Sequence, residues 1–147
     1  MNSSFLYFDL QHAVRVHDWI IENTGGRPGA NDLGLLDSLL NHIQNDDYYP
    51  SFEEKLLHLV FAVNKSHAFA DGNKRSSIAL GAYFLELNGY AYCVRHFVLS
   101  MENIAVWVAE GKICKELLGK ILESLLYEED YSDELKILLI EAISREI

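Results

Sequence analysis

Apolar residues recur at a helical spacing along almost the whole chain, and this pattern limits the fold more than any other feature of the sequence. In the segment 10–24, for example, Ala13, His17 and Ile20 fall on one face of a helix. Turn-rich strand patterns are scarce, and only the short stretch YAYCV at 90–94 has a β-prone composition. The periodicity therefore predicts an all-α fold, a single compact bundle of about seven helices.

Capping residues and glycines predict where the helices begin and end. Asp9 can cap the first helix, and Gly25 can end it in a left-handed conformation. Ser51 and Glu54 have the spacing of a capping box, and the strongly apolar helix that follows them is expected at the centre of the core. Further helix starts are expected at Asn31 or Asp32, at Gly72–Asn73, at Ser100 and at Ser132, the last helix running to Ile147.

The length and composition favour one globular domain spanning residues 1–147. Half of the residues are apolar and 23% are charged, and neither a linker nor an internal repeat interrupts the chain. Trp19 and Trp107 fall on apolar helical faces and are expected in the core. Cys93 and Cys114 form no C-x-x-C pair and are expected to be reduced.

The charge of the chain argues against some classes of partner. The formal net charge is −10, whereas binding to nucleic acid or to an anionic membrane needs a surplus of Lys and Arg on one face. The amino-terminal segment lacks a basic stretch followed by an apolar run, and no apolar stretch approaches the roughly 18 residues of a membrane span. We therefore expect a cytoplasmic protein without nucleic-acid or membrane partners.

The stretch HAFADGNKRSS at 67–77 concentrates the polar chemistry of the chain in one turn between two helices. A helix that begins at Gly72–Asn73 offers unpaired backbone N–H groups and a partial positive charge to an anion. Gly72 lets the backbone approach closely, and Asn73 can add a neutral donor. Lys74 and Arg75 can add charged donors, so this turn is expected to bind phosphate.

Asp71 and His67 complete the predicted site. A carboxylate beside a phosphate is repulsive unless a cation lies between them, and Mg²⁺ is usually held by one or two carboxylates and phosphate oxygens. The expected ligand is therefore a magnesium-bound nucleoside triphosphate, with Asp71 as the metal ligand. His67 can accept a proton near neutral pH and could activate a hydroxyl for attack on phosphorus. Phe69 is expected to point inward and to anchor the turn.

Other site types find no support in the sequence. The six histidines include no pair at i, i+4 for a helical zinc site, and neither a P-loop nor a G-x-G-x-x-G motif is present. Two alternatives without catalysis remain, which are an inactive adaptor that binds nucleotide or a partner, and a helical DNA-binding module. His67 and Asp71 argue against the adaptor, because binding alone needs neither, and the net charge argues against the DNA-binding module.

The motif resembles the signature of the Fic/Doc family, H-x-F-x-[D/E]-G-N-x-R, with every position filled. The resemblance covers roughly residues 8–92 and includes the glycine-rich stretch GGRPGANDLG at 25–34, which is similar to the flap of Doc-type members. It implies an all-helical fold with this flap before the second helix. It also implies that His67 is the general base, that Asp71 binds Mg²⁺, and that Gly72, Asn73 and Arg75 hold phosphate.

Two departures from the AMP-transferring members of the family bear on the reaction. Lys74 stands where those proteins usually have a second glycine, and Ile78 stands where they have a second arginine. The lysine–arginine arrangement resembles Doc-type toxins, in which the nucleotide is thought to bind reversed, so that the γ-phosphate faces the histidine. The resemblance thus favours phosphoryl transfer from ATP or another NTP to a Ser or Thr hydroxyl of a target protein, with AMP transfer as the alternative.

The same resemblance implies a toxin that a partner restrains. Family inhibitors use a helix with the pattern [S/T]-x-x-x-E-[G/N], and SLLYEE at 124–129 fits only its first five positions. A separate antitoxin chain of the Phd type is therefore favoured over self-inhibition. In the flap, Gly26 and Arg27 are candidates for contact with the target or the nucleotide, although a loop arginine can equally be solvated.

Overall fold

The computed structural model describes residues 4–145, and in this part of the chain it contains seven α-helices and one short 3-10 helix. The predicted all-α fold is confirmed. The described residues contain no β-strand, only an isolated antiparallel bridge between Ala30 and Phe69. The helices are α1 (Leu10–Thr24), α2 (Leu33–His42), α3 (Phe52–Lys65), α4 (Asn73–Leu87), η1 (Ala91–Cys93), α5 (Val94–Ala109), α6 (Lys115–Tyr127) and α7 (Asp133–Ile143).

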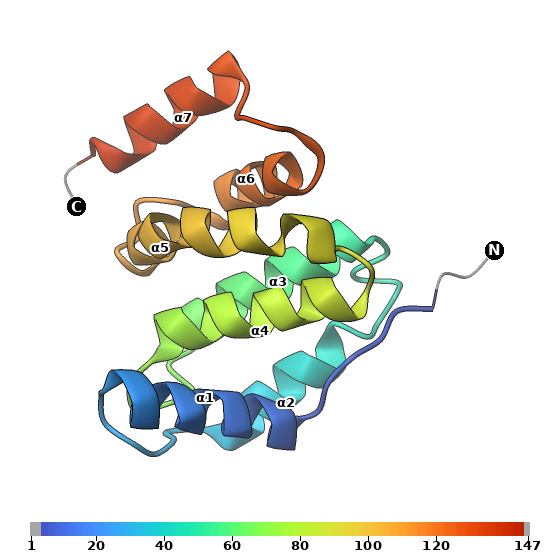
Figure 1. Ribbon diagram of the computed structural model, residues 1–147, viewed down its shortest axis with the longest axis vertical. Coiled ribbons are helices and arrows are strands. Elements are labelled where there is room, and N and C mark those ends of the chain that lie inside the picture. Colours follow the sequence, from blue (N-terminus) through green and yellow to red (C-terminus); the bar gives the residue numbers. More distant parts are fainter. Residues whose placement is uncertain (1–3, 146–147) are drawn as a thin grey trace.

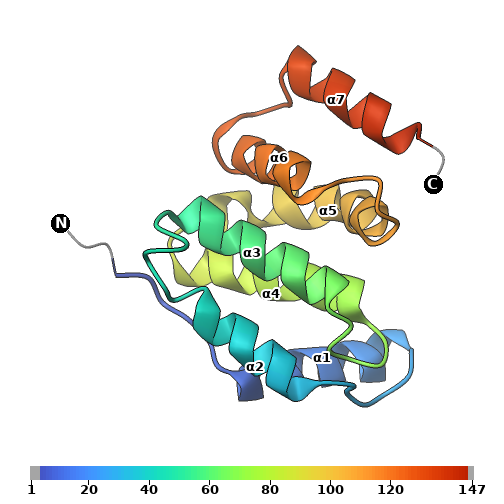
Figure 2. The ribbon, with the colours of Figure 1, turned by 180° about the vertical axis from the view of Figure 1, so that it is seen from behind.

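Helices α3 and α4 form the centre of the bundle (Figures 1 and 2). α1 and α2 lie on one side of this pair, α5 and α6 lie on the other, and α7 lies beyond α6. The most extensive helix–helix contact is that between α3 and α4. Their connection, residues 66–72, therefore leaves the middle of the core and reaches the surface beside the end of α1.

The apolar faces of the two central helices explain this arrangement. Leu56 and Leu59 of α3 and Leu80 and Phe84 of α4 are completely buried. A fully buried side chain of this size contributes about 1.5–3 kcal/mol relative to an exposed one. Ser51 caps the start of α3 as predicted, because its hydroxyl accepts from the Glu54 backbone N–H at 3.1 Å, whereas the Glu54 carboxylate accepts from the Ser51 hydroxyl at 3.0 Å and not from the Ser51 backbone N–H that a capping box uses.

The connection between α2 and α3 is fixed by a buried charge. Lys55 is fully buried, and its ammonium group donates to the carbonyl oxygen of Ile43 at 2.9 Å and to Asp46 Oδ1 at 2.7 Å. A buried ammonium needs such partners because it has left water. The pair holds the end of α2 against the start of α3.

Two expectations about elements were wrong. The β-prone stretch at 90–94 forms η1 and the start of α5, since a single short strand without a partner is not stable. Ser100 lies inside α5, which begins six residues earlier at Val94.

The expectation that Trp19 lies in the core was also wrong. Trp19 is 63% exposed because it follows the buried His17 by two residues and so falls on the opposite face of α1. The predicted end of the last helix at Ile147 lies outside the described residues, and α7 ends at Ile143.

Among residues 4–145, no helix combines the length and the apolar character that crossing a membrane requires. Cys93 and Cys114 are both free.

Candidate active site at the start of helix α4

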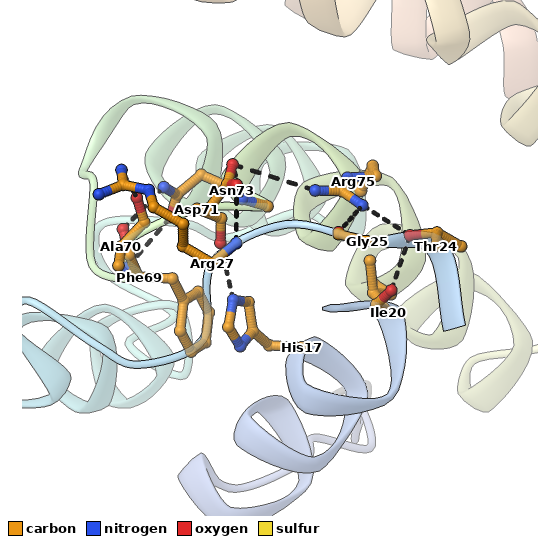
Figure 3. Close-up of polar contacts among 11 residues, drawn as sticks. His17, Ile20, Thr24, Gly25, Arg27, Phe69, Ala70, Asp71, Asn73 and Arg75 are labelled. Atoms are coloured by element: carbon orange, nitrogen blue, oxygen red, sulfur yellow. Dashed lines mark hydrogen bonds and ion pairs between the residues drawn. The ribbon is translucent and has the colours of Figure 1, made fainter. Parts of the chain in front are cut away.

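Phe69 fixes the turn between α3 and α4 by packing into the core. Its side chain is 1% exposed, and the imidazole ring of His17 from α1 stacks on it almost in parallel, with 3.7 Å between ring centroids (Figure 3). His17 is itself 1% exposed, and its Nε2 donates to the main-chain oxygen of Asp71 at 2.7 Å. A residue of α1 therefore holds the turn at two points.

The side chain of Asn73 closes the same turn from the other side. Its Oδ1 accepts from the Phe69 N–H at 3.1 Å, and its Nδ2 donates to the Phe69 carbonyl at 3.0 Å. The amide expected to serve as a neutral donor to phosphate thus holds the backbone of the turn with its oxygen and one of its two N–H hydrogens. Residue 73 leaves the second hydrogen of Nδ2 and its backbone N–H for an anion.

The first turn of α4 presents unpaired backbone donors. The first amide of the helix to find a backbone acceptor is that of Ser76, which donates to the Gly72 carbonyl at 2.9 Å. Within residues 4–145, the backbone N–H groups of Asn73, Lys74 and Arg75 donate to no acceptor. Gly72 precedes them with φ +81°, a left-handed conformation that glycine adopts without strain. Together these groups form a cradle for an anion.

Asp71 is oriented by two backbone amides. Its Oδ2 accepts from the Arg27 N–H at 3.0 Å and its Oδ1 from the Gly72 N–H at 2.8 Å. The N–H of Arg27 and then that of Gly72 are the largest causes of a lowered pKa for this carboxyl. The side chain is 41% exposed and ionised at neutral pH, and each oxygen keeps a lone pair free for a further ligand.

One carboxylate of this kind fits Mg²⁺ that arrives with a nucleotide. In the described part of the chain, no group of three or more His, Cys, Asp or Glu could hold a metal ion without other ligands. Mg²⁺ keeps several waters and commonly binds through one or two carboxylates together with substrate phosphates. Asp71 beside the anion cradle matches this requirement.

Arg75 joins the cradle to the end of α1. Its Nη1 donates to the Thr24 hydroxyl at 2.6 Å and to the Gly25 carbonyl at 2.8 Å, and its Nη2 lies 4.0 Å from Asp71 Oδ1 (Figure 3). The hydrogens on Nη2 and Nε remain for a phosphate oxygen. Thr24 positions the guanidinium, and this role was not predicted from the sequence.

The part of the flap that precedes α2, residues 25–32, lies across the turn and pairs with it. Ala70 donates its N–H to the Gly29 carbonyl at 3.0 Å, and Asn31 donates its N–H to the Ala68 carbonyl at 2.8 Å. The Arg27 guanidinium donates to the Ala70 carbonyl at 3.0 Å, so this arginine is not simply solvated. Gly26 has φ +123°, and a Cβ added there would lie 2.9 Å from Asp71 Oδ2.

His67 and Lys74 are less engaged. His67 is exposed and has φ +54°, a conformation that strains a residue other than glycine and that recurs at functional sites. Its carbonyl accepts from Asn31 Nδ2 at 3.1 Å, whereas its imidazole makes no hydrogen bond within residues 4–145. Lys74 is exposed on the first turn of α4. Contacts thus unite Asp71, Gly72, Asn73, Arg75 and the flap, while His67 joins them through the backbone alone.

Comparison with known proteins identifies the family of the chain. Residues 7–85, more than half of the chain, match the model of the Fic/DOC family. The chain belongs to the Fic/DOC family. The matched range runs from just before α1 into α4, so it includes the flap and the complete turn.

Two curated relatives carry the name Doc. "Protein kinase doc" of Escherichia phage P1 is 31% identical over 83 residues, which are 54% of this chain and 65% of that protein. "Toxin Doc" of Mycolicibacterium smegmatis is 36% identical over 69 residues, which are 44% of this chain and 53% of that protein. This Fic/DOC chain therefore spans less than two thirds of the length of either relative.

His17 is the main site residue that sequence reasoning missed. Its signal was present, since a histidine on the otherwise apolar face of a helix needs a polar partner when it is buried. The sequence alone did not identify that partner, because the Asp71 carbonyl lies 54 residues away along the chain.

Proposed function

We propose that this protein is an NTP-dependent transferase that moves a phosphoryl group to a Ser or Thr hydroxyl of a target protein. The single observation that carries the proposal is the complete signature at 67–75, folded at the start of a helix with three unpaired N–H groups and an oriented, ionised Asp71. The name of one relative, "Protein kinase doc", agrees with this class of reaction.

In the proposed reaction each group has one task. The backbone N–H groups of residues 73–75 and the free guanidinium hydrogens of Arg75 bind the polyphosphate. His67 takes the proton of the target hydroxyl while the hydroxyl oxygen forms a bond to the γ-phosphorus. The bond from that phosphorus to the β–γ bridging oxygen breaks, and the nucleoside diphosphate leaves with the negative charge.

Mg²⁺, held by Asp71 and phosphate oxygens, would neutralise charge on the polyphosphate. Lys74 and Ile78, in place of the glycine and the second arginine of AMP-transferring members, favour the γ- over the α-phosphate as the group transferred. Lys74 is exposed beside the cradle and adds a cation there.

We further propose that the transferase acts as a toxin restrained by an antitoxin chain. The name of one relative, "Toxin Doc", and the family membership support this role. An antitoxin is expected to cover the turn at 67–75, since access of the target hydroxyl to His67 is what it would have to prevent.

The test asks which phosphate of ATP is transferred to protein. The protein is incubated in a cell lysate with Mg²⁺ and with ATP labelled either on the γ- or on the α-phosphate. The proposal predicts that only the γ label passes to protein. Transfer of the α label alone would establish AMP transfer instead, and transfer of neither label would leave an inactive adaptor as the better account.

A further inference from the structure

An apolar groove runs between α2 and α3 and reaches Ser66, the residue before the proposed base. Its volume is about 450 Å³, and its floor includes Leu35 and Leu39 of α2 and Phe61 of α3. Figure 2 shows α2 and α3 side by side on this face of the molecule. Ser66, which caps the end of α3, lines the groove, and the next residue in the chain is the exposed His67.

The charge of this groove is opposite to that of the whole protein. The chain has 22 Asp and Glu residues and a net charge of −10, yet none of the ten lining residues is acidic. Lys65 and Lys115 are its cations, and His42 and His58 line it as well. Burial, followed by the charges of Lys115 and His42, lowers the pKa of His58 to about 4, so the lysines supply the positive charge at neutral pH.

The cations are held in place by their neighbours. Lys65 donates to the Val108 carbonyl at 3.2 Å, and Lys115 Nζ lies 3.2 Å from His58 Nδ1. Leu35, by contrast, is 42% exposed although it is apolar. An apolar floor and a cationic rim match a peptide with apolar side chains flanked by carboxylates.

We propose that the groove between α2 and α3 docks an acidic, amphipathic segment of the target protein and so delivers its hydroxyl to His67. The proposal rests on the proposed transferase activity. It selects the target as occupant because Ser66, which lines the groove, directly precedes residue 67 in the chain, and because a segment seated there finds cations at Lys65 and Lys115. Apolar side chains of the segment cover Leu35 and Phe61, and its carboxylates face Lys65 and Lys115.

The test compares two double variants with the same change of charge. Lys65→Glu with Lys115→Glu reverses the rim, whereas Arg95→Glu with Lys120→Glu reverses two exposed cations outside the groove. The rate at which the γ label passes from ATP to lysate protein is measured against lysate concentration. Thermal unfolding and binding of Mg²⁺-ATP serve as controls for the fold and the nucleotide site.

Docking predicts that the rim variant needs about tenfold more lysate protein for half its maximal rate, since like charges then oppose each other at two rim positions. The maximal rate and nucleotide binding should stay near wild type, as should every property of the control variant. Added salt should weaken labelling by wild type more than labelling by the rim variant.

Two further groove variants guard against misfolding of the rim variant. One replaces both lysines by a neutral polar side chain, and the other leaves the lysines unchanged. Lys65→Gln with Lys115→Gln and the single change Leu35→Asp should each raise the lysate requirement several-fold in a folded protein. Equal lysate requirements for wild type and all groove variants would overturn the docking proposal alone. Absence of labelling by wild type would overturn the transferase, and the docking site with it. Concentration-dependent self-association lost only in the rim variant would assign the groove to a second copy and would also overturn the proposal.

Discussion

His17 makes two contacts with the site that can be removed one at a time. Phenylalanine keeps a ring on Phe69 but loses the donor to the Asp71 carbonyl, whereas glutamine keeps an N–H donor and loses the stack. An unpaired buried acceptor costs about 1–3 kcal/mol, and an aromatic pair contributes about 0.5–1.5 kcal/mol. His17 is thus a positioning residue that acts through Asp71.

We expect His17→Phe to raise the Mg²⁺ concentration needed for half-maximal transfer, because the backbone that carries Asp71 is no longer held. His17→Gln should lower the melting temperature by loss of the stack but leave the Mg²⁺ requirement near wild type. Transfer assays over a range of Mg²⁺, with thermal unfolding of the same samples, check both. Equal Mg²⁺ requirements in the two variants would show that the hydrogen bond does not position Asp71.

The pKa of Asp71 offers a second test at this scale. Its folded pKa is lowered below the ordinary value of 3.8, first by the Arg27 N–H. The stabilising contribution is therefore complete above pH 3.8 and is lost as the pH falls through the folded pKa. Arg27→Pro removes the N–H and should raise the Asp71 pKa, while Arg27→Ala keeps the N–H and should change it little. NMR titration of the side-chain carboxyl carbon measures both, and identical titrations would contradict the assignment.

The flap follows α1 and contacts the signature. Substitutions at two of its glycines can distinguish the effect of backbone strain from the effect of crowding. Gly26 and Gly29 have φ of +123° and +100°, so alanine is strained at either position by about 1–3 kcal/mol. Only at Gly26 would the added Cβ meet other atoms, Asp71 Oδ2 and Ile21 Cδ1, both at 2.9 Å.

We therefore expect Gly26→Ala to destabilise the protein by about 1 kcal/mol or more beyond Gly29→Ala. Denaturant unfolding gives both free energies, and hydrogen exchange at the Arg27 and Ala70 amides reports whether the flap opens. Faster exchange at both amides is expected in Gly26→Ala. A Gly29→Ala protein that is equally destabilised would show that contact with Asp71 contributes nothing.

Local signals predicted the elements well where they agreed with packing. Asp9, Asp32, Ser51 and Ser132 each cap a helix as their side chains suggested. The segment 90–94 failed because β propensity cannot act without a partner strand, and the helical neighbours supplied none. Ser100 failed because a serine inside a helix carries no signal that distinguishes it from a cap.

At the scale of the whole molecule, the helices differ in how easily they open, and α7 is expected to open first. α7 lies beyond α6 in both views and buries only Leu135 and Ala142, whereas α3 buries seven residues. An element with little buried apolar surface opens at low free energy. Besides its packing on α6, α7 is held through Arg145, whose Nη2 donates to the Lys112 carbonyl at 2.6 Å.

Native-state hydrogen exchange should consequently show the fastest amide exchange of any helix in α7 and the slowest in α3 and α4. α6, of similar length but with seven buried residues, is the internal comparison and should be protected close to α3. Protection of α7 equal to that of α3 would contradict this order.

The sequence predicted the parts of the site that are close together in the chain, but not the contacts between distant residues. The turn at 67–75 was located from adjacent residues alone, because its backbone donors and Asp71 lie within one stretch of chain. The contacts of His17, Thr24 and Asn31 were not predicted, because each joins residues 36–54 positions apart. Asn73 was expected to face an anion, and only the folded turn revealed its bonds to Phe69.

The central claim is that His67 removes the proton from the target hydroxyl at a nucleotide site that the turn itself forms. The direct measurement is transfer of the γ label by His67→Ala, together with its binding of Mg²⁺-ATP. The account predicts a loss of transfer of about 10²–10⁴-fold with nucleotide affinity close to wild type. Undiminished transfer by His67→Ala would contradict it.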